Sequence, residues 1–240
     1  VLAQTYPLVE CIIVDDGSTD NTRERLQPYL SRIDYRYQDN QERSAARNHG
    51  LRVAKGEFVA FLDADDYWMP AELERQVQLF ARMPHLGLVY TQVQLVDERD
   101  TFVRNWLGAG QPWPEPGFDA FRRCALMDDF IIAGLSTLMF RRECLPGASW
   151  FAEDVVQAEE WPLALRLAHH WKIDLIPEIL VAYRIDKSYL PEKLNKRHAQ
   201  DTWVKIIQEA FVHQPHTDEY DELGRNALAR ALIDGALVDF

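Results

Sequence analysis

Two short apolar runs in this chain each end in a cluster of carboxylates. Residues 11–14 lead into Asp15 and Asp16, and residues 58–62 lead into the sequence Asp-Ala-Asp-Asp at 63–66. Short apolar runs bounded by turn residues are typical of buried strands, and the ligands of open α/β sheets bind beyond the carboxyl ends of such strands. Acids gathered at that edge repel one another unless a cation lies among them. The pattern therefore predicts a divalent metal ion that carries a phosphate.

Length and composition are those of an ordinary globular protein. With 240 residues, 47% of them hydrophobic, the chain can bury a full core as one domain, alone or with a smaller appendage. The formal net charge of −12 argues against a general affinity for nucleic acid or for an anionic membrane surface. No apolar run approaches the roughly 20 residues that cross a bilayer, so we expect no transmembrane segment in this chain. The widely spaced cysteines form no Cys-x-x-Cys pair, which predicts reduced thiols in a cytoplasmic protein.

Strand and helix patterns alternate along most of the chain. Besides the two acidic strands, the sequence predicts helices at 22–30, 44–53, 70–83, 118–127 and 161–171, and strands at 35–37, 86–95, 135–140 and 173–183. Such alternation predicts the α/β class, with a mostly parallel sheet flanked by helices. From residue 192 onward, apolar residues recur at helical spacing, which predicts a helical C-terminal appendage.

Five motifs, in one order, give the chain a family resemblance. They are CIIVDDGSTDNT from residue 11, SAARNHGL from 44, GEFVAFLDADDYWMP from 56, STLMFRREC from 136 and AEEWPLALRLA from 158. Together they resemble a family 2 glycosyltransferase of the Rossmann-like GT-A fold. The resemblance covers residues 1–190 and leaves 191–240 as a helical C-terminal extension. It implies an inverting enzyme that moves a sugar from a nucleotide-diphosphate donor to an acceptor hydroxyl, with Mn²⁺ or Mg²⁺ as cofactor.

The resemblance assigns roles to the two acidic clusters. Asp16 matches the family residue that accepts a hydrogen bond from the nucleotide base, with Asp15 beside it. Asp65 matches the metal-binding carboxylate of the DxD motif, and Asp63 would support it. The chemistry agrees, because a cation held by oxygen ligands stabilises the charge that develops on a leaving diphosphate. The alternative is structural: Asp66 would cap the helix that begins near residue 70.

Glu160 occupies the position of the family's catalytic base, just before the helix predicted from residue 161. A carboxylate there could take the proton from the acceptor hydroxyl as it attacks the anomeric carbon. The family usually has an Asp as the second member of this acidic pair, whereas this chain has Glu159 and Glu160. The alternative is that both are first-turn glutamates favoured by the helix dipole.

Three arginines complete the predicted donor site. Arg47, followed by Asn48, matches a family segment, and Arg43 precedes it in the same stretch. A guanidinium there could meet the base or the diphosphate, although an arginine on a solvated helix face has the same pattern. Arg184 matches a position after the last core strand that approaches the phosphates in the family.

The resemblance also implies partners and a setting. We expect a nucleotide-diphosphate sugar as donor, with UDP as the first candidate, and a glycan, lipid-linked or small-molecule acceptor. We expect no nucleic acid partner. A cytoplasmic place, at the inner face of the membrane in a surface-glycan pathway, follows by family analogy only.

The start of the chain departs from the family pattern. Residues 1–7 resemble the end of the family's first helix, so the first strand, which supplies part of the nucleotide pocket, is not matched. This predicts an N-terminally truncated fragment of a longer protein.

Other protein classes fit some of the same residues. A phosphoacceptor receiver domain shares the paired acids and the string from Asp66 to Pro70, but it needs a lysine on a later strand, and none occurs between Lys55 and Lys172. A dehalogenase-like phosphatase would have Thr or Val where Tyr67 stands. A third interpretation keeps the fold and denies catalysis, which leaves a nucleotide-binding or scaffold protein.

Overall fold

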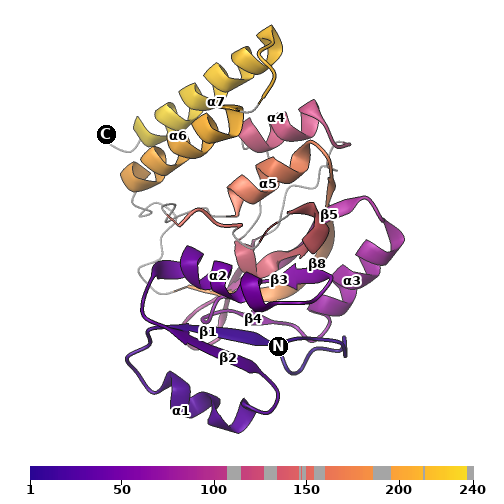
Figure 1. The fold of residues 1–240 in the computed structure, drawn as a ribbon, viewed down its shortest axis with the longest axis vertical. Coiled ribbons are helices and arrows are strands. Elements are labelled where there is room, and N and C mark those ends of the chain that lie inside the picture. The colour runs from indigo at the N-terminus through magenta and orange to yellow at the C-terminus, as the bar shows by residue number, and fades with distance from the viewer. Residues whose placement is uncertain are drawn as a thin grey trace.

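The computed structural model describes residues 1–106, 115–126, 134–145, 147, 150–153, 160–185, 196–212 and 214–236. In these residues the strands form two sheets, one of two strands and one of six, and helices surround them (Figure 1). The predicted α/β class is confirmed.

The smaller sheet contains the first acidic strand. Its elements and the adjoining helices are β1 (Ile12–Asp16), α1 (Thr22–Leu26), a 3₁₀ turn (Gln27–Tyr29), β2 (Asp34–Gln38) and α2 (Glu42–Val53). β1 and β2 are parallel, so their carboxyl ends meet, with Asp16 opposite Gln38. α2 packs on β1. The acidic end of β1 therefore lies next to the loop that leads into α2.

The larger sheet contains the second acidic strand. Its members are β3 (Phe58–Ala60), β4 (Tyr67–Trp68), β5 (Leu86–Val96), β6 (Phe102–Trp106), β7 (Leu138–Arg141) and β8 (Lys172–Arg184). The strand order is β3-β7-β5-β8-β4, and β6 pairs with β5 outside this path. β5 and β8 are parallel, whereas β3–β7, β5–β7, β5–β6 and β4–β8 are antiparallel.

The expectation of a mostly parallel sheet is wrong for this larger sheet. Residues 97–101 join β5 to β6, a connection too short for a parallel crossover, which needs a dozen residues or more. An apolar run indicates that a strand is buried, but it carries no information on the direction of the neighbours. The direction of each pair follows from how the chain returns to the sheet.

Helices cover both faces of the larger sheet. They are α3 (Glu72–Arg82), α4 (Phe118–Leu126), α5 (Trp161–Ala168), α6 (Lys196–Val212) and α7 (Asp218–Ala236). Phe80 of α3 packs in a cluster with Val89, whereas Phe121 of α4 and Trp161 of α5 share a cluster with Leu88. Because Leu88 and Val89 are neighbours in β5, these two clusters lie on opposite faces of the sheet.

The predicted C-terminal helices are present as α6 and α7. They pack against each other, and they also contact α5 and α4, on the side away from the β1–β2 sheet (Figure 1). The boundary predicted between residues 190 and 191 lies outside the described residues, so the division into two units stays a prediction.

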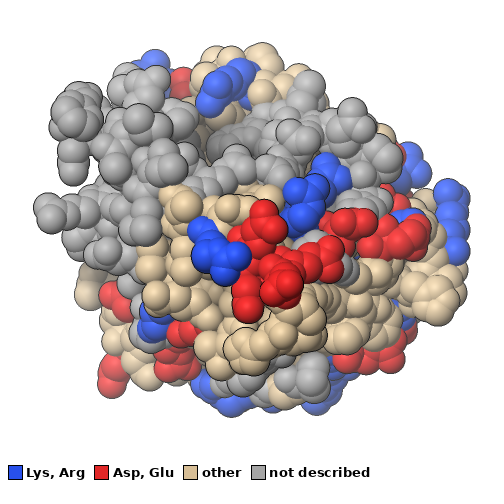
Figure 2. Space-filling view, turned by 90° about the horizontal axis from the view of Figure 1, so that it is seen from above, with Lys and Arg blue, Asp and Glu red and all other residues tan. Residues whose placement is uncertain are grey.

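The face on which α7 lies is acidic in part. The first turn of α7 contains Asp218, Glu219 and Asp221, and the view from above shows acidic side chains gathered near the middle of this face (Figure 2). Such a face repels a phosphate backbone; that nucleic acid is not a partner stays a prediction. Within the described ranges, no helix has the length and apolar character needed to cross a membrane.

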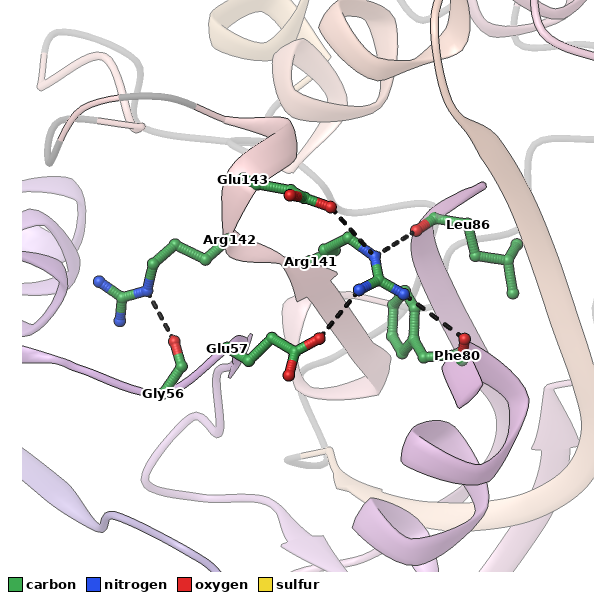
Figure 3. A network of polar contacts seen from close by, with 7 residues as sticks. All are labelled: Gly56, Glu57, Phe80, Leu86, Arg141, Arg142 and Glu143. Atoms are coloured by element: carbon green, nitrogen blue, oxygen red, sulfur yellow. Dashed lines mark hydrogen bonds and ion pairs between the residues drawn. The ribbon is translucent and has the colours of Figure 1, made fainter. Parts of the chain in front are cut away.

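Arg141, at the end of β7, joins several segments of the core. Its guanidinium pairs with Glu57 at 3.0 Å and donates to the backbone carbonyls of Leu86 (3.1 Å) and Phe80 (3.4 Å) (Figure 3). It also lies over the rings of Phe58 and Phe80, 5.2 and 5.3 Å from their centroids. A cation at the end of α3 suits the negative end of the helix dipole. This network fixes the end of β3 that lies away from the acids.

Candidate functional site

Residues 63–66 follow β3 and form a turn that we call the acidic loop. The Asp66 N–H donates to the Asp63 carbonyl at 3.1 Å, which closes the turn. The buried Asp66 side chain accepts hydrogen bonds from the Ser136 hydroxyl at 2.6 Å and from the Arg184 backbone N–H at 3.1 Å. The Ser136 oxygen in turn accepts the Asp63 N–H at 3.1 Å. Asp66 and Ser136 thus attach the loop to the turn before β7 and to the end of β8.

Asp66 is a buried anchor and not a helix cap. The prediction that Asp66 caps the following helix is wrong, because α3 begins at Glu72 and its N-cap residue is Ala71. Burial raises the pKa of Asp66 to about 6, and the hydrogen bonds from Ser136 and Arg184 oppose that rise. Ser136 itself was not predicted as a site residue, since a serine before a buried strand carries no distinctive signal.

The other two acids of the loop have different surroundings. Asp63 forms an ion pair with Arg47 of α2, with 2.8 Å between Nη2 and Oδ1. Asp65 is exposed, and its carboxylate makes no hydrogen bond or ion pair with any residue in the described ranges. Asp65 is therefore the acid of this loop whose oxygens face solvent.

Arg184, at the end of β8, lies against the acidic loop. Its Nε donates to the Asp65 carbonyl at 3.0 Å, and its Nη2 pairs with Asp100 of the β5–β6 turn at 2.8 Å. Nη1 reaches the Glu98 carbonyl at 3.4 Å. The structure thus brings Arg47 and Arg184 into contact with the acidic loop; their role in donor binding stays a prediction.

The two acids at the end of β1 also differ from each other in burial and in how many of their oxygens are hydrogen-bonded. Asp15 is buried, and its two oxygens accept the Ser18 N–H at 2.8 Å and the Tyr35 hydroxyl at 2.5 Å. Burial acts to raise the pKa of Asp15, but the hydrogen bonds from Ser18 and Tyr35 outweigh it, so the pKa is lowered. Asp16 is half-buried; its Oδ1 accepts from the Gln38 amide and the Gln41 N–H. Its Oδ2 makes no hydrogen bond to the described part of the chain.

Consecutive residues of α2 link these groups. Arg47 pairs with Asp63, and Asn48 hydrogen-bonds the backbone of Phe151. His49 Nδ1 lies 2.7 Å from the Gln38 side chain, which binds Asp16. One helix therefore contacts the acidic loop directly through Arg47 and reaches Asp16 through Gln38. The sequence pointed to Arg47, and three adjacent polar residues on a partly buried helix are a signal that could have indicated the rest.

The remaining predicted residues lie at helix starts. Arg43 is exposed in the first turn of α2. Glu160 is half-buried at the N-cap of α5, where its carbonyl accepts the Ala164 N–H. Its predicted companion Glu159 lies outside the described residues.

The side chains that could bind a hard cation supply only some of the ligands that such an ion needs. No group of three or more His, Cys, Asp or Glu side chains that could hold a metal ion occurs among the residues described. Mg²⁺ and similar ions are usually bound through one or two carboxylates together with substrate phosphates. The exposed Asp65, with Asp63 two residues before it, fits that incomplete kind of site, in which the phosphates supply the other oxygens.

A cavity of about 860 Å³ lies on the other side of Phe151, between α5 and the C-terminal helices. Its lining includes Pro162, Arg166 and His169 of the α5 segment and Tyr220 of α7. None of the predicted site residues lines it. The cavity is thus separate from the acidic clusters.

Comparisons with known proteins found relatives of this chain. An uncharacterised glycosyltransferase of Nostoc sp. (alr2836) is 34% identical over 192 residues, which are 77% of this chain and 58% of that protein. An Escherichia coli protein, the UDP-Glc:alpha-D-GlcNAc-diphosphoundecaprenol beta-1,3-glucosyltransferase WfgD, is 35% identical over 99 residues, 40% of this chain and 39% of its own. The chain thus matches less than two thirds of the length of these relatives.

The fold has solved counterparts. The crystal structure of Staphylococcus aureus TarS 1-349 in complex with UDP-GlcNAc superposes with a TM-score of 0.69 at 20% identity, over 96% of this chain and 66% of that one. At this identity the likeness establishes the fold, which is GT-A as predicted. The family model described as glycosyl transferase family 2 matches residues 1–145. The chain therefore belongs to the family 2 glycosyltransferases.

Proposed function

We propose that this protein transfers a sugar from a nucleotide-diphosphate donor to an acceptor hydroxyl, with inversion and with Mn²⁺ or Mg²⁺. The observation that carries the proposal is the acidic loop. Asp65 is exposed there beside Arg184, and the buried Asp66 holds the loop in place through its hydrogen bond from Ser136. Buried anchors of this kind hold a site in place before the ligand arrives, and such preorganisation favours catalysis.

The donor would lie between the two acidic clusters. Asp65, supported by Asp63, would hold the cation, which when bound stabilises the charge that develops on the leaving diphosphate. The Oδ2 atom of Asp16 is the acceptor for an N–H of the base, since its Oδ1 is used by Gln38 and Gln41. Asp15 would not contact the nucleotide itself, because hydrogen bonds from Ser18 and Tyr35 occupy both of its oxygens; it would hold the end of β1 in place.

Three arginines complete the proposed donor site. Arg184 has N–H groups beyond the three bonded ones, and these can meet the diphosphate. Arg47 contacts the same loop through its ion pair with Asp63. Arg43, exposed in the first turn of α2, is within the same helix and would face the base or the phosphates.

Glu160 would be the base. It would take the proton from the acceptor hydroxyl while that oxygen attacks the anomeric carbon on the face opposite the leaving group. A Glu at this position places the carboxylate about 1 Å further from the backbone than an Asp. Exchange of Glu160 for Gln keeps the shape and removes the base, so we expect transfer to be lost while donor binding is kept.

The donor nucleotide and acceptor are proposed from the named relatives. TarS binds UDP-GlcNAc, and WfgD uses UDP-Glc and a diphosphoundecaprenol-linked sugar, as their names state. We therefore propose a UDP-sugar as donor and a glycan acceptor, lipid-linked in the first instance. Such an acceptor would place the protein at the cytoplasmic face of a membrane, bound peripherally.

Thermal stability measures donor binding directly. We would heat the full-length protein with UDP-, GDP-, dTDP- and CDP-sugars, with and without Mn²⁺. A ligand at 100 times its Kd adds about 2.7 kcal/mol of stability. We expect a rise in Tm for a UDP-sugar that depends on Mn²⁺, and we expect Asp65→Asn to remove the dependence on Mn²⁺. Asp16→Asn should weaken nucleotide binding with or without the metal.

A catalytically inactive nucleotide-binding protein of the same fold is the second candidate. The Glu-Glu pair at 159–160, where the family usually has Asp second, favours it. It predicts the same rise in Tm but no release of UDP with any acceptor. If no nucleotide raised Tm in the full-length protein, the transferase proposal would be wrong.

A further inference from the structure

Asn48, in the middle of α2, is fully buried, and both the nitrogen and the oxygen of its side-chain amide are hydrogen-bonded. Its Nδ2 donates to the Phe151 carbonyl at 2.9 Å and to Glu153 Oε1 at 3.2 Å. Its Oδ1 accepts the Phe151 N–H at 3.1 Å. The side chain therefore pairs with both backbone groups of Phe151, as a neighbouring strand would. A buried amide satisfied in this way is expensive to disturb.

The segment that Asn48 holds is also held from the opposite side. Arg166 of α5 donates from Nη2 to the Trp150 carbonyl and from Nε to the Pro162 carbonyl in the first turn of the same helix. Trp150 and Phe151 are both buried. These two residues, which we call the 150–151 link, thus lie between α2 and α5.

The same link touches the donor side. The guanidinium of Arg47 lies 5.6 Å from the centroid of the Phe151 ring while its Nη2 pairs with Asp63 of the acidic loop. At the other end, α5 begins directly after Glu160. A chain of direct contacts therefore runs from the acidic loop through Arg47 and the 150–151 link to the helix that carries Glu160.

We propose that Asn48 is a positioning residue for sugar transfer: it fixes the 150–151 link and so sets the place of Glu160 relative to the donor. The inference rests on the proposed function and deepens it. Displacement of a reacting group by about 1 Å can cost 10²-fold in rate. Asn48 itself touches neither substrate nor metal in this proposal, so donor binding does not depend on it.

The test uses a substitution that conserves the size of the side chain and replaces the Nδ2 donor, which makes two hydrogen bonds, by an acceptor. In Asn48→Asp, the new carboxylate would keep the bond from the Phe151 N–H but would face the Phe151 carbonyl and the Glu153 carboxylate. We expect kcat for UDP release from UDP-GlcNAc or UDP-Glc to fall about 10²-fold, with the Kd of UDP changed less than about twofold. A second exchange, Glu153→Gln, supplies an amide donor to that carboxylate, and we expect the double variant to regain at least tenfold in kcat.

Matched variants guard against a general loss of folding. Asn226→Asp makes the same chemical change at an exposed site of α7 and should leave kcat unaltered. Arg166→Lys acts on the link from the other side and should lower kcat while UDP binding is retained. The proposal is overturned if Asn48→Asp keeps the original kcat, if its UDP affinity falls in parallel with kcat, or if Glu153→Gln gives no recovery. Absence of UDP binding and UDP release in the unaltered protein would instead contradict the proposed function.

Discussion

Replacement of Glu72 by Gln should change how the stability of this protein depends on pH. Glu72 is fully buried in α3, and its Oε1 accepts the Thr91 hydroxyl at 3.0 Å. Its Oε2 has no hydrogen-bond partner in the described structure, and neither has Gln76 Oε1 one turn further along. Burial raises the pKa of Glu72 to about 8, against the opposing effect of the bond from Thr91. The folded protein thus keeps this carboxyl protonated at neutral pH.

The sign of the effect follows from proton linkage. An unfolded Glu has a pKa of 4.5, so between pH 4.5 and 8 the folded state binds more protons than the unfolded state. The free energy of unfolding must then fall as pH rises, by about 1.4 kcal/mol per pH unit. The stability that Glu72 contributes through its bound proton is fully present below pH 4.5 and is lost as pH rises through about 8. Between pH 5 and pH 8 this one group lowers stability by about 3 to 4 kcal/mol.

Urea unfolding at pH 5, 6, 7 and 8 measures this slope. Glu72→Gln keeps an acceptor for Thr91 and cannot ionise, so its curve should fall less steeply, and by pH 8 it should be the more stable protein by about 3 kcal/mol. Glu24→Gln removes the same charge at an exposed position of α1 and should leave the slope unaltered. Parallel pH profiles for the unaltered protein and Glu72→Gln would refute the reasoning, because they would mean that Glu72 ionises equally in both states.

Three further substitutions test the framework of the site. Gly17→Ala should destabilise the folded protein by about 1 to 3 kcal/mol in urea unfolding, because φ is +76° and the added Cβ would lie 2.7 Å from the Asn40 nitrogen. Ser136→Ala removes the hydrogen-bond donor to Oδ2 of the buried Asp66, whose Oδ1 keeps the Arg184 N–H, and should cost about 1 to 3 kcal/mol; it should also raise the KM for the sugar donor, with partial recovery in Ser136→Thr. Arg141→Ala should cost about 2 to 4 kcal/mol by leaving two backbone carbonyls unbonded, and Arg141→Lys should cost less; Tm reports both.

Local features were predictable from the sequence. Each acidic cluster follows its own apolar strand, and α2, α3 and α5 begin and end within a few residues of their predicted bounds. These properties depend on nearest neighbours and on periodicity, which the sequence records directly. The family could be recognised for the same reason, since its motifs are contiguous strings.

The roles within the site depended on the tertiary structure. Asp65 and Asp66 are adjacent, yet one faces solvent and the other is buried against Ser136, 70 positions away, and Arg184, 118 positions away. Asn48 meets Phe151 across 103 positions. Hydrogen bonds between such distant segments follow from the order and direction of strands in the sheet, which no local propensity encodes. The sequence by itself therefore determined the family and the residues that could do chemistry, while the tertiary structure decided which of them face solvent and which hold the others in place.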